Sequence, residues 1–296
     1  TYHKVLTDNI FTSNYLLDRW ARKGSSTAAG LKNSEPVTHA KNATAGAFDP
    51  RGAFAVANND KRTKFEFDWK FYQASVQLWE VDKYMNQGAG VWQLVDLVKA
   101  EFENAQLSIE GQIGADIFQL ATTDPLGLVG LQSMVQDIPA AGTYGGISRT
   151  TETFFNNKQK TMAVLNLDDM YAAYLDASDS NDSPTITIST KAVLPLYNKQ
   201  LTPIQRIQDA TTGRAGFQKL YFLDNPVVYD NNCAAQHMYM LNEKYLVWRI
   251  LKGVNFKMRD AVVPNNVWSS VKSIFYGACM YHRRPARNCV LTTIAS

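Results

Sequence analysis

A long amphipathic stretch between residues 91 and 119 constrains the fold more than any other feature. Apolar side chains recur there at steps of three and four residues, the period of one helix face. They are Val91, Leu94, Val95, Val98, Phe102, Ala105, Ile109, Ile113 and Ile117. The stretch predicts a helix about 43 Å long, with Glu101, Glu103, Glu110 and Asp116 on the other side. Gly111 and Gly114 lie inside it and mark a predicted flex point, because glycine weakens a helix.

A second constraint is the alternation of aromatic and polar residues just before that helix. Phe65, Phe67, Trp69 and Phe71 alternate with polar residues and Tyr72, which predicts a strand. The apolar phase shifts after Gln73, which predicts a bulge or a bend there. This strand is the return half of a two-stranded excursion over residues 36–79. Its predicted tip, residues 45–54, is rich in turn residues.

The rest of the chain predicts an alternation of short elements. Residues 1–23 form an amphipathic arm with Ile10, Leu16, Leu17 and Trp20 as apolar points, and residues 24–35 a flexible link. A helix is expected over 166–177, capped by Asn166 and packing through Leu167, Met170, Tyr171, Tyr174 and Leu175. Strands are expected at 185–190, 219–223, 226–230 and 237–241, with helical turns over 191–209 and a final hairpin of 271–282 with 288–294. The mixture over 161–241 reads as an α/β subdomain.

Composition excludes several classes of function. A net charge of +3 argues against tight nucleic-acid binding. Three cysteines without CxxC spacing argue against a disulfide scaffold or zinc site. No apolar run approaches the length of a membrane span, and no secretory signal opens the chain, so the protein is expected to be cytosolic when made. No nucleotide-binding, hydrolase or metalloprotease motif occurs, so we expect no catalytic, cofactor or metal residues.

Two charged features have alternative interpretations. His282, Arg283, Arg284 and Arg287 cluster near the end of the chain. They fit a charged surface turn, or a contact with acidic groups of a neighbouring subunit or with packaged DNA. The acidic loop over 176–182 lacks the glycine and terminal glutamate of a calcium loop, so a solvated loop is expected.

Several segments together resemble the major capsid proteins of tailed bacteriophages, which have the Hong Kong ninety-seven-type fold. The segment FDWKFYQASVQLW at 67–79 resembles the return strand of the family's extended loop, and residues 91–119 resemble its spine helix. DPLGLVGLQSMV at 124–135 and YGGISRTTETFF at 144–155 are similar to a family segment in which an aromatic pair follows an arginine. Residues 215–246 resemble the apical strands, and 283–294 the final hairpin. The likeness covers nearly the whole chain.

The resemblance implies an α+β shell subunit with no enzymatic activity and no cofactor. It implies an N-terminal arm (1–34), an extended β-hairpin loop (35–79), a peripheral domain with the spine helix (80–135), an α/β apical domain (136–246) and final peripheral strands (247–296). The expected partners are further copies of the chain, as pentamers and hexamers of an icosahedral phage head. Scaffold, portal and decoration proteins are further partner classes, and packaged double-stranded DNA is expected to touch the shell weakly. Assembly is expected in the cytoplasm of the bacterial host.

The extended loop supplies the hypothesised inter-subunit contact. Phe48 and Phe54 stand near its tip beside Asp49 and Arg51. A tip facing only water has little use for two phenylalanines. We therefore expect both rings to be buried against a neighbouring chain and Arg51 to meet an acidic group there. An isopeptide cross-link from Lys61 or Lys64 to Asn265 or Asn266 has no supporting motif and is not expected.

Three other functions compete with a phage head. An encapsulin-like compartment shares the fold and would hold cargo enzyme. An α/β hydrolase or transferase needs a convergent site that the sequence lacks. A sugar-binding tail fibre would be rich in strands, against the long predicted helix.

Overall fold

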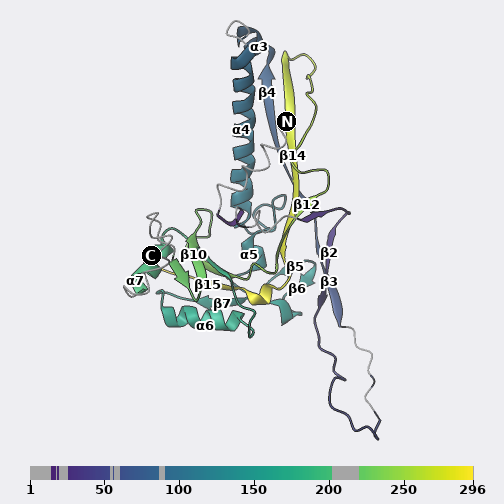
Figure 1. Cartoon of the computed structure of the whole chain (residues 1–296), viewed down its shortest axis with the longest axis vertical. Coiled ribbons are helices and arrows are strands. Elements are labelled where there is room, and N and C mark those ends of the chain that lie inside the picture. The colour runs from purple at the N-terminus through teal and green to yellow at the C-terminus, as the bar shows by residue number, and fades with distance from the viewer. Residues whose placement is uncertain are drawn as a thin grey trace.

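A computed structural model describes residues 15–17, 19, 26–53, 56, 61–86, 91–201 and 220–295. Three parts stand out (Figure 1). A long upright part carries helix α4 (Val91–Asp116) beside strands β4 (Lys70–Trp79) and β14 (Ser269–His282). A second lobe lies at its base, and a thin hairpin projects away from both.

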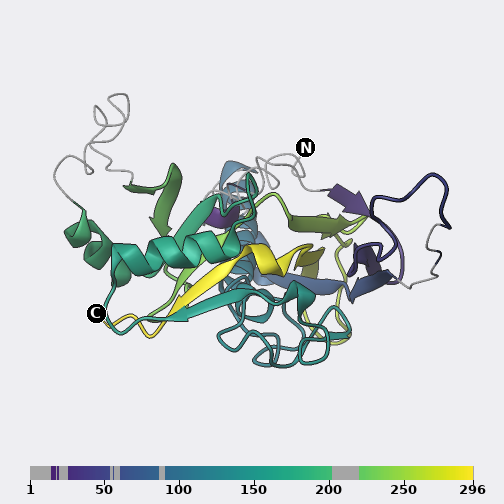
Figure 2. The same cartoon turned by 90° about the horizontal axis from the view of Figure 1, so that it is seen from below.

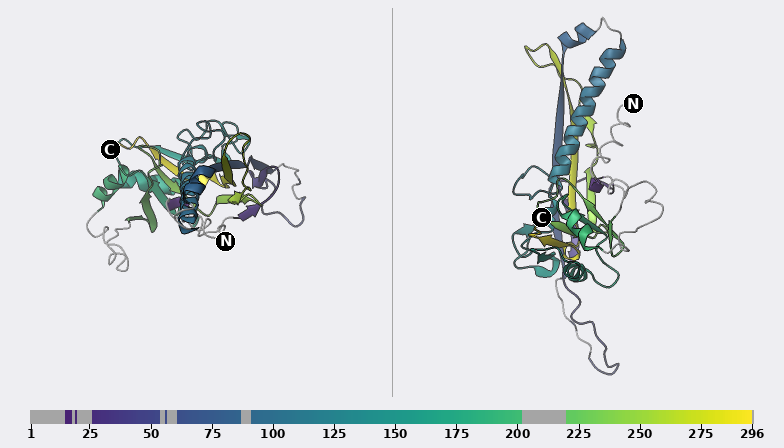
Figure 3. Two further views of the ribbon diagram at one scale, coloured as in Figure 1. Left: turned by 90° about the horizontal axis from the view of Figure 1, so that it is seen from above. Right: turned by 90° about the vertical axis from the view of Figure 1, so that its left-hand side faces the viewer.

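The upright part is one five-stranded sheet with α4 on one face. Its strand order is β1 (Ser26–Ala28), β12 (Leu246–Leu251), β14 and β13 (Lys257–Met258), and β4 pairs with β14. The ladder from β4 to β14 runs antiparallel from Trp79 opposite Ser269 to Lys70 opposite Ala278. Helix α4 lies along these strands (Figure 3). The short helix α3 (Glu80–Asn86) follows β4 at the far end.

The predicted long helix is confirmed, with its apolar face against the sheet. Phe102, Ile109 and Ile113 are buried beside Val76 of β4. The expectation that Glu110 and Asp116 face away is wrong, because both are buried. Each carboxylate has a local partner: Gln106 donates to Glu110, and Gln112 donates to Asp116. Paired acids can lie inside, which a hydrophobic pattern does not show.

The change of phase in the aromatic stretch lies earlier than predicted. Strand β3 (Arg62–Phe67) buries Phe65 and Phe67, whereas β4 buries Tyr72 and Val76 and leaves Phe71 exposed. The switch therefore falls at the break between the two strands, not after Gln73. Hydrogen bonds of the hydroxyl stabilise the inward position of Tyr72. The hydroxyl donates to Asp116 Oδ2 at 2.5 Å and accepts from the Leu128 N–H at 3.0 Å.

The lower lobe holds the second sheet, six strands in the order β7 (Lys158–Thr161), β15 (Cys289–Thr292), β11 (Met238–Leu241), β8 (Ile186–Ser189), β10 (Asn225–Tyr229) and β9 (Leu220–Phe222). Helix α6 (Leu167–Ala177) packs on β7 and β15, and α7 (Val193–Gln200) contacts β10 (Figure 2). The strands predicted in this region and the Asn166 cap are confirmed: Asn166 Oδ1 accepts from the Asp168 N–H.

The buried face of α6 differs from the predicted one. Met170, Ala173 and Ala177 are buried, whereas Tyr171 and Leu175 are half-exposed. Small alanines let the helix approach the sheet closely, and this displaces the contact face from the largest side chains.

The predicted final hairpin is wrong. Strand β14 belongs to the first sheet, and β15 belongs to the second, where it lies between β7 and β11. A 3₁₀ turn, η3 (Pro285–Arg287), carries the chain from one sheet to the other. Two strands joined by a short turn read as a hairpin in sequence, but here each has better partners elsewhere. Residues 247–296 therefore contribute to both sheets.

The predicted flexible link is also wrong, since part of it is ordered. Strand β1 pairs in parallel with the edge of β12, Ser26 opposite Arg249. Strand β2 (Asn33–Thr38) begins the projecting hairpin. Backbone pairing needs no particular side chain, so small polar residues suffice there. Of the four apolar points of the predicted arm, Leu16 and Leu17 are buried in the core. Ile10 and Trp20 lie outside the described residues.

The remaining elements are short. They are α5 (Leu131–Met134), β5 (Thr143–Tyr144), β6 (Ile147–Ser148) and η2 (Thr153–Phe155). No helix in the described part of the chain is long and apolar enough to cross a membrane.

Candidate assembly site

The projecting hairpin is made of β2 and β3 and ends in a long tip. The two strands pair from Asn33 opposite Phe67 to Thr38 opposite Arg62, and the His39 N–H donates to the Lys61 carbonyl at 3.0 Å. Beyond this bond, the hydrogen bonds of the tip's described residues are local. The Ala45 N–H donates to the Asn42 carbonyl, and the Gly52 N–H donates to the Asp49 carbonyl. The tip extends into solvent, away from both sheets (Figure 1).

The residues predicted to make the inter-subunit contact lie in this tip. Phe48 is 68% exposed, and Asp49 and Arg51 are exposed as well. Asp49 Oδ1 accepts from the backbone N–H of Arg51 at 3.0 Å, which shapes the turn. Phe54 lies outside the described residues. The nearby Val56 is 85% exposed. The tip thus presents apolar side chains that its own chain does not cover.

The root of the hairpin, in contrast, is fixed by aromatic packing. Phe65 lies 5.4 Å from the Tyr144 ring and 5.3 Å from the Phe155 ring, both edge-on, and Phe67 stacks on Tyr281 at 4.7 Å. Gly145 allows this approach. Its φ is +58°, and a Cβ there would lie 2.7 Å from the Phe65 ring. The glycine-containing turn over 142–146 is therefore part of the hairpin's anchor.

A partly buried ionic network also ties the root to the first sheet. Glu35 of β2 accepts from Arg249 of β12 at 3.2 Å, from the Tyr281 hydroxyl of β14 at 2.8 Å and from Arg283 at 2.7 Å. Arg249 also donates to Asn33 at 2.7 Å. The sequence offered no signal for Glu35, because its partners are more than two hundred residues away. Contacts within the single chain therefore set the direction in which the hairpin projects.

Arg149 holds the segment behind this root. It is fully buried, and its guanidinium donates to the carbonyls of Ser133 and Met134 and to Asn157 Oδ1. It lies over the rings of Tyr144 and Phe155, at 5.2 and 5.6 Å. Burial lowers the pKa of Arg149 to about 10, so it stays charged at neutral pH. Arg149, the arginine of the segment 144–155, therefore has a structural role.

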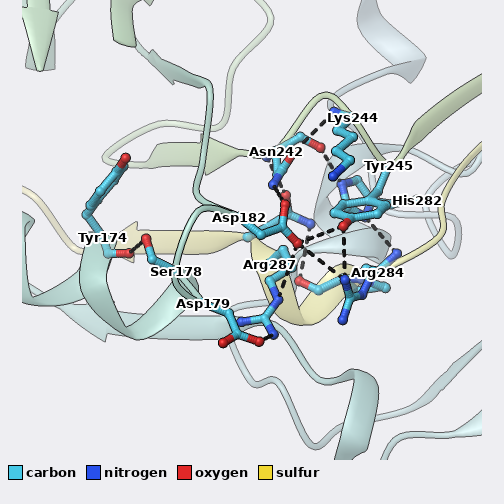
Figure 4. Close-up of polar contacts among 12 residues, drawn as sticks. Tyr174, Ser178, Asp179, Asp182, Asn242, Lys244, Tyr245, His282, Arg284 and Arg287 are labelled. Carbon is cyan, nitrogen blue, oxygen red and sulfur yellow. Dashed lines mark hydrogen bonds and ion pairs between the residues drawn. The ribbon is translucent and has the colours of Figure 1, made fainter. Parts of the chain in front are cut away.

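The basic cluster near the end of the chain meets acidic groups of its own chain (Figure 4). Arg284 lies 3.3 Å from Asp182, Arg287 pairs with Asp179 and lies 3.8 Å from Asp182, and Arg283 pairs with Glu35. Partial burial raises the pKa of Asp182, but hydrogen bonds from Tyr245 and Asn242 outweigh it and hold that pKa below its usual value. Asp179 and Asp182 of the acidic loop are therefore paired with arginines of the same chain. No group of three or more metal-ligating side chains gathers in the described part of the chain.

The predicted flex point lies in an unbroken stretch of α4. The helix runs through both glycines to Asp116. Gly111 is exposed, with no atom within 4 Å of where its Cβ would be, and Gly114 is buried. Whether the helix bends there in another state stays a prediction.

Comparison with known proteins identifies the fold. No family model and no curated protein sequence matches the chain. Solved structures do match. The chain of the cyanophage A-1(L) capsid has 15% identity and a TM-score of 0.65, with 92% of this chain and 90% of that chain covered. The holo-SrpI encapsulin complex from Synechococcus elongatus has 9% identity and a TM-score of 0.58, with 93% and 87% covered.

A third match is the procapsid of satellite phage P4 with its size determination protein. It has 12% identity and a TM-score of 0.55, with 99% of this chain and 90% of that chain covered. At such low identities the likeness concerns the fold alone. In each of these matches the likeness covers more than nine-tenths of this chain. The chain therefore has the Hong Kong ninety-seven-type α+β fold, the fold of tailed-phage capsid and encapsulin shell subunits.

Proposed function

We propose that the chain is a structural subunit that assembles with copies of itself into the icosahedral head of a tailed phage and encloses its double-stranded DNA. One observation carries the proposal. The hairpin has a rigid root and a tip whose apolar side chains, including Phe48 and Val56, are uncovered in the single chain. Projecting elements of this kind need a partner surface. In a closed shell every copy supplies such a surface to the next.

The proposed parts follow the sequence-based division. They are an arm over 1–34, an extended loop over 35–79, a peripheral part with the spine helix over 80–135 and an apical part over 136–246. The strands after 247 belong to both sheets, so the peripheral part ends before β15. Partners in the matched structures support further partner classes here: a size determination protein in one and decoration proteins in another.

An encapsulin-like compartment is the second candidate function. The match to the encapsulin complex, with a TM-score of 0.58 over 93% of the chain, favours it specifically. The arginine segment at 144–155, which resembles that of phage capsid proteins, favours the phage head. The contents of particles purified from the native source decide between them: DNA supports the head, and a cargo enzyme supports the compartment.

The loop contact can be tested by replacing residues 45–58 with a short Gly-Ser turn. We expect the monomer to keep its melting temperature, because the described tip contributes nothing to the buried core. Closed particles should disappear, because the lost contact recurs around every ring. Calorimetry of the monomer and particle counts by electron microscopy measure the two effects.

A pair of point variants sharpens this test. Phe48→Ser removes a tip side chain, and Leu126→Ser removes one that is 81% exposed on a turn of the main body. We expect Phe48→Ser to lower the particle count and Leu126→Ser to leave it unchanged. Normal shells from the loop replacement would show that the loop is not the clasp, and an unfolded monomer would show that it belongs to the core.

A further inference from the structure

Helix α4 ends on a buried carboxylate where the upright part meets the lower lobe (Figure 1). Asp116 is the last residue of the helix and is only 1% exposed. The C-terminal end of a helix carries partial negative charge, so the helix itself disfavours an anion there. The last turn of α4 holds no basic residue that would offset this charge. A buried acid in this position needs strong partners or a proton.

A second carboxylate reaches the same place from the turn that follows the helix. A Cβ on Gly127 would lie 2.6 Å from Asp116 Oδ2 and 3.1 Å from Asp124 Oδ2. Asp124 shapes this turn, because its Oδ1 accepts from the Leu126 N–H at 2.9 Å and its carbonyl accepts from the Gly127 N–H at 3.3 Å. The backbone therefore holds the two acids side by side, and glycine is the residue that fits next to them.

The donors to Asp116 are neutral. The Tyr72 hydroxyl donates to its Oδ2 at 2.5 Å, and Gln112 donates to its Oδ1 at 2.9 Å. Burial raises the pKa of Tyr72, so its hydroxyl stays a donor at neutral pH. Lys70 of β4 also reaches this turn, but its ammonium group donates to the Pro125 carbonyl. No cation in the described part of the chain pairs with Asp116.

We propose that Asp116 and Asp124 form a proton-operated clamp that joins the base of α4, strand β4 and the turn over 124–130. When the pair holds a proton, the repulsion between the two charges is absent, and the protonated carboxyl group can donate to its neighbour. When both groups are ionised, repulsion loosens the clamp. The clamp is a property of the single subunit, so it goes beyond the shell function and does not depend on it.

Acid should therefore stabilise this part of the subunit. Burial raises the pKa of Asp116, the charge of Asp124 adds to this, and the hydrogen bonds from Tyr72 and Gln112 offset it only in part. The folded chain thus binds this proton more tightly than the unfolded chain does. The contribution of Asp116 to the free energy of unfolding is fully present below its ordinary pKa of 3.8 and is lost as the pH rises through the raised value.

The test compares Asp116→Asn, a neutral group of the same shape, with the unchanged monomer. The free energy of unfolding of both is measured by denaturant titration at steps between pH 4 and pH 7. Titrating groups that the two proteins share cancel in the difference. We expect the variant to gain stability relative to the unchanged chain as the pH rises. A difference that is constant with pH, or that moves the other way, would overturn the clamp, because Asp116 would then act only through its shape or as a stabilised anion.

A second variant tests the partner. Asp124→Asn keeps the Oδ1 that accepts from the Leu126 N–H and removes the second charge. In this background, Asp116→Asn should change the stability with a weaker pH-dependence. An equally strong pH-dependence in both backgrounds would remove Asp124 from the clamp and overturn the paired mechanism.

Hydrogen exchange of the unchanged monomer tests whether the clamp closes. The Leu128 amide donates to the Tyr72 hydroxyl, so the amides of the turn report its closure. After correction for the intrinsic effect of pH, exchange over residues 124–135 should be more than about twofold slower at pH 5 than at pH 7. Asp116→Asn should remove this difference. Equal protection of the unchanged chain at both pH values would overturn the proposed closure.

None of these measurements requires a particle, so failure of the clamp leaves the shell function untouched.

Discussion

Arg149 shows how a single buried charge can organise a loop-rich region. Its guanidinium donates to three oxygens, those of Ser133, Met134 and Asn157, and the Asn157 oxygen also accepts from the Gln136 N–H. Each lost hydrogen bond of this kind costs roughly 1–3 kcal/mol. The flanking rings of Tyr144 and Phe155 add cation–π attraction in place of a carboxylate. The arginine thereby links the 131–157 segment to the hairpin root.

His282 gives a pH-dependence at the residue scale. It is buried, its Nε2 lies 2.9 Å from the Asn242 carbonyl, and its Nδ1 accepts from the Arg284 N–H at 3.2 Å. Burial lowers its pKa from 6.5 to about 4, against the raising effect of those contacts and of Asp182. The unfolded chain therefore takes up a proton that the folded chain refuses. The contribution of His282 to the free energy of unfolding is fully present above pH 6.5. It is lost as the pH drops toward 4, which lowers the stability by about 3 kcal/mol.

The measurement is the free energy of unfolding of the unassembled subunit by denaturant titration between pH 7 and pH 4. His282→Gln can still donate to the Asn242 carbonyl but does not titrate, so its slope over this window should be shallower. Identical slopes for the two proteins would exclude His282 as the source.

At the scale of elements, the spine helix tests the flex-point hypothesis. Gly111→Ala places a methyl group in open space, so it should stabilise the straight helix by up to about 1 kcal/mol. Gly114 is buried, so Gly111→Ala serves as the packing-neutral comparison for the double variant. We expect the Gly111→Ala, Gly114→Ala variant to fold and to yield fewer precursor shells. Unchanged yield and shape of precursor shells, seen by microscopy, would count against a bend at this point.

Local patterns predicted the elements well and their partners poorly. The long helix, the Asn166 cap and the strands of the second sheet depend on neighbouring residues, and each was predictable from the local sequence. The separation of β14 from β15 depends on strands far away along the chain, which no local period records. Glu35 was missed as an anchor for the same reason. Arg149 was missed although its hydrogen-bond partners are close in sequence, because a hydrophobic pattern does not mark a buried arginine. The proposed contact of Phe48 involves a neighbouring chain, so one sequence supplies only the hypothesis.

At the scale of the whole molecule, the junction between the sheets should make unfolding cooperative. Asp182 lies before β8 of the second sheet and accepts from Tyr245, which lies just before β12 of the first sheet, and from Arg284. Asp182→Asn should cost about 1–2 kcal/mol, because Arg284 is half-exposed and water screens its share. We expect one calorimetric transition for the unchanged monomer and a broader or split one for the variant. An equally sharp transition in both would show that the short connector alone couples the sheets.

The late position of three strands has a consequence for how the protein is made on the ribosome. Strand β1 pairs with β12, β4 with β14, and β7 with β15, so early strands wait for partners that are translated last. Such distant pairing slows folding. A nascent chain that has reached residue 245 can complete neither sheet. We therefore expect the competent subunit to appear only after synthesis has passed β15, which keeps half-made chains out of a growing particle.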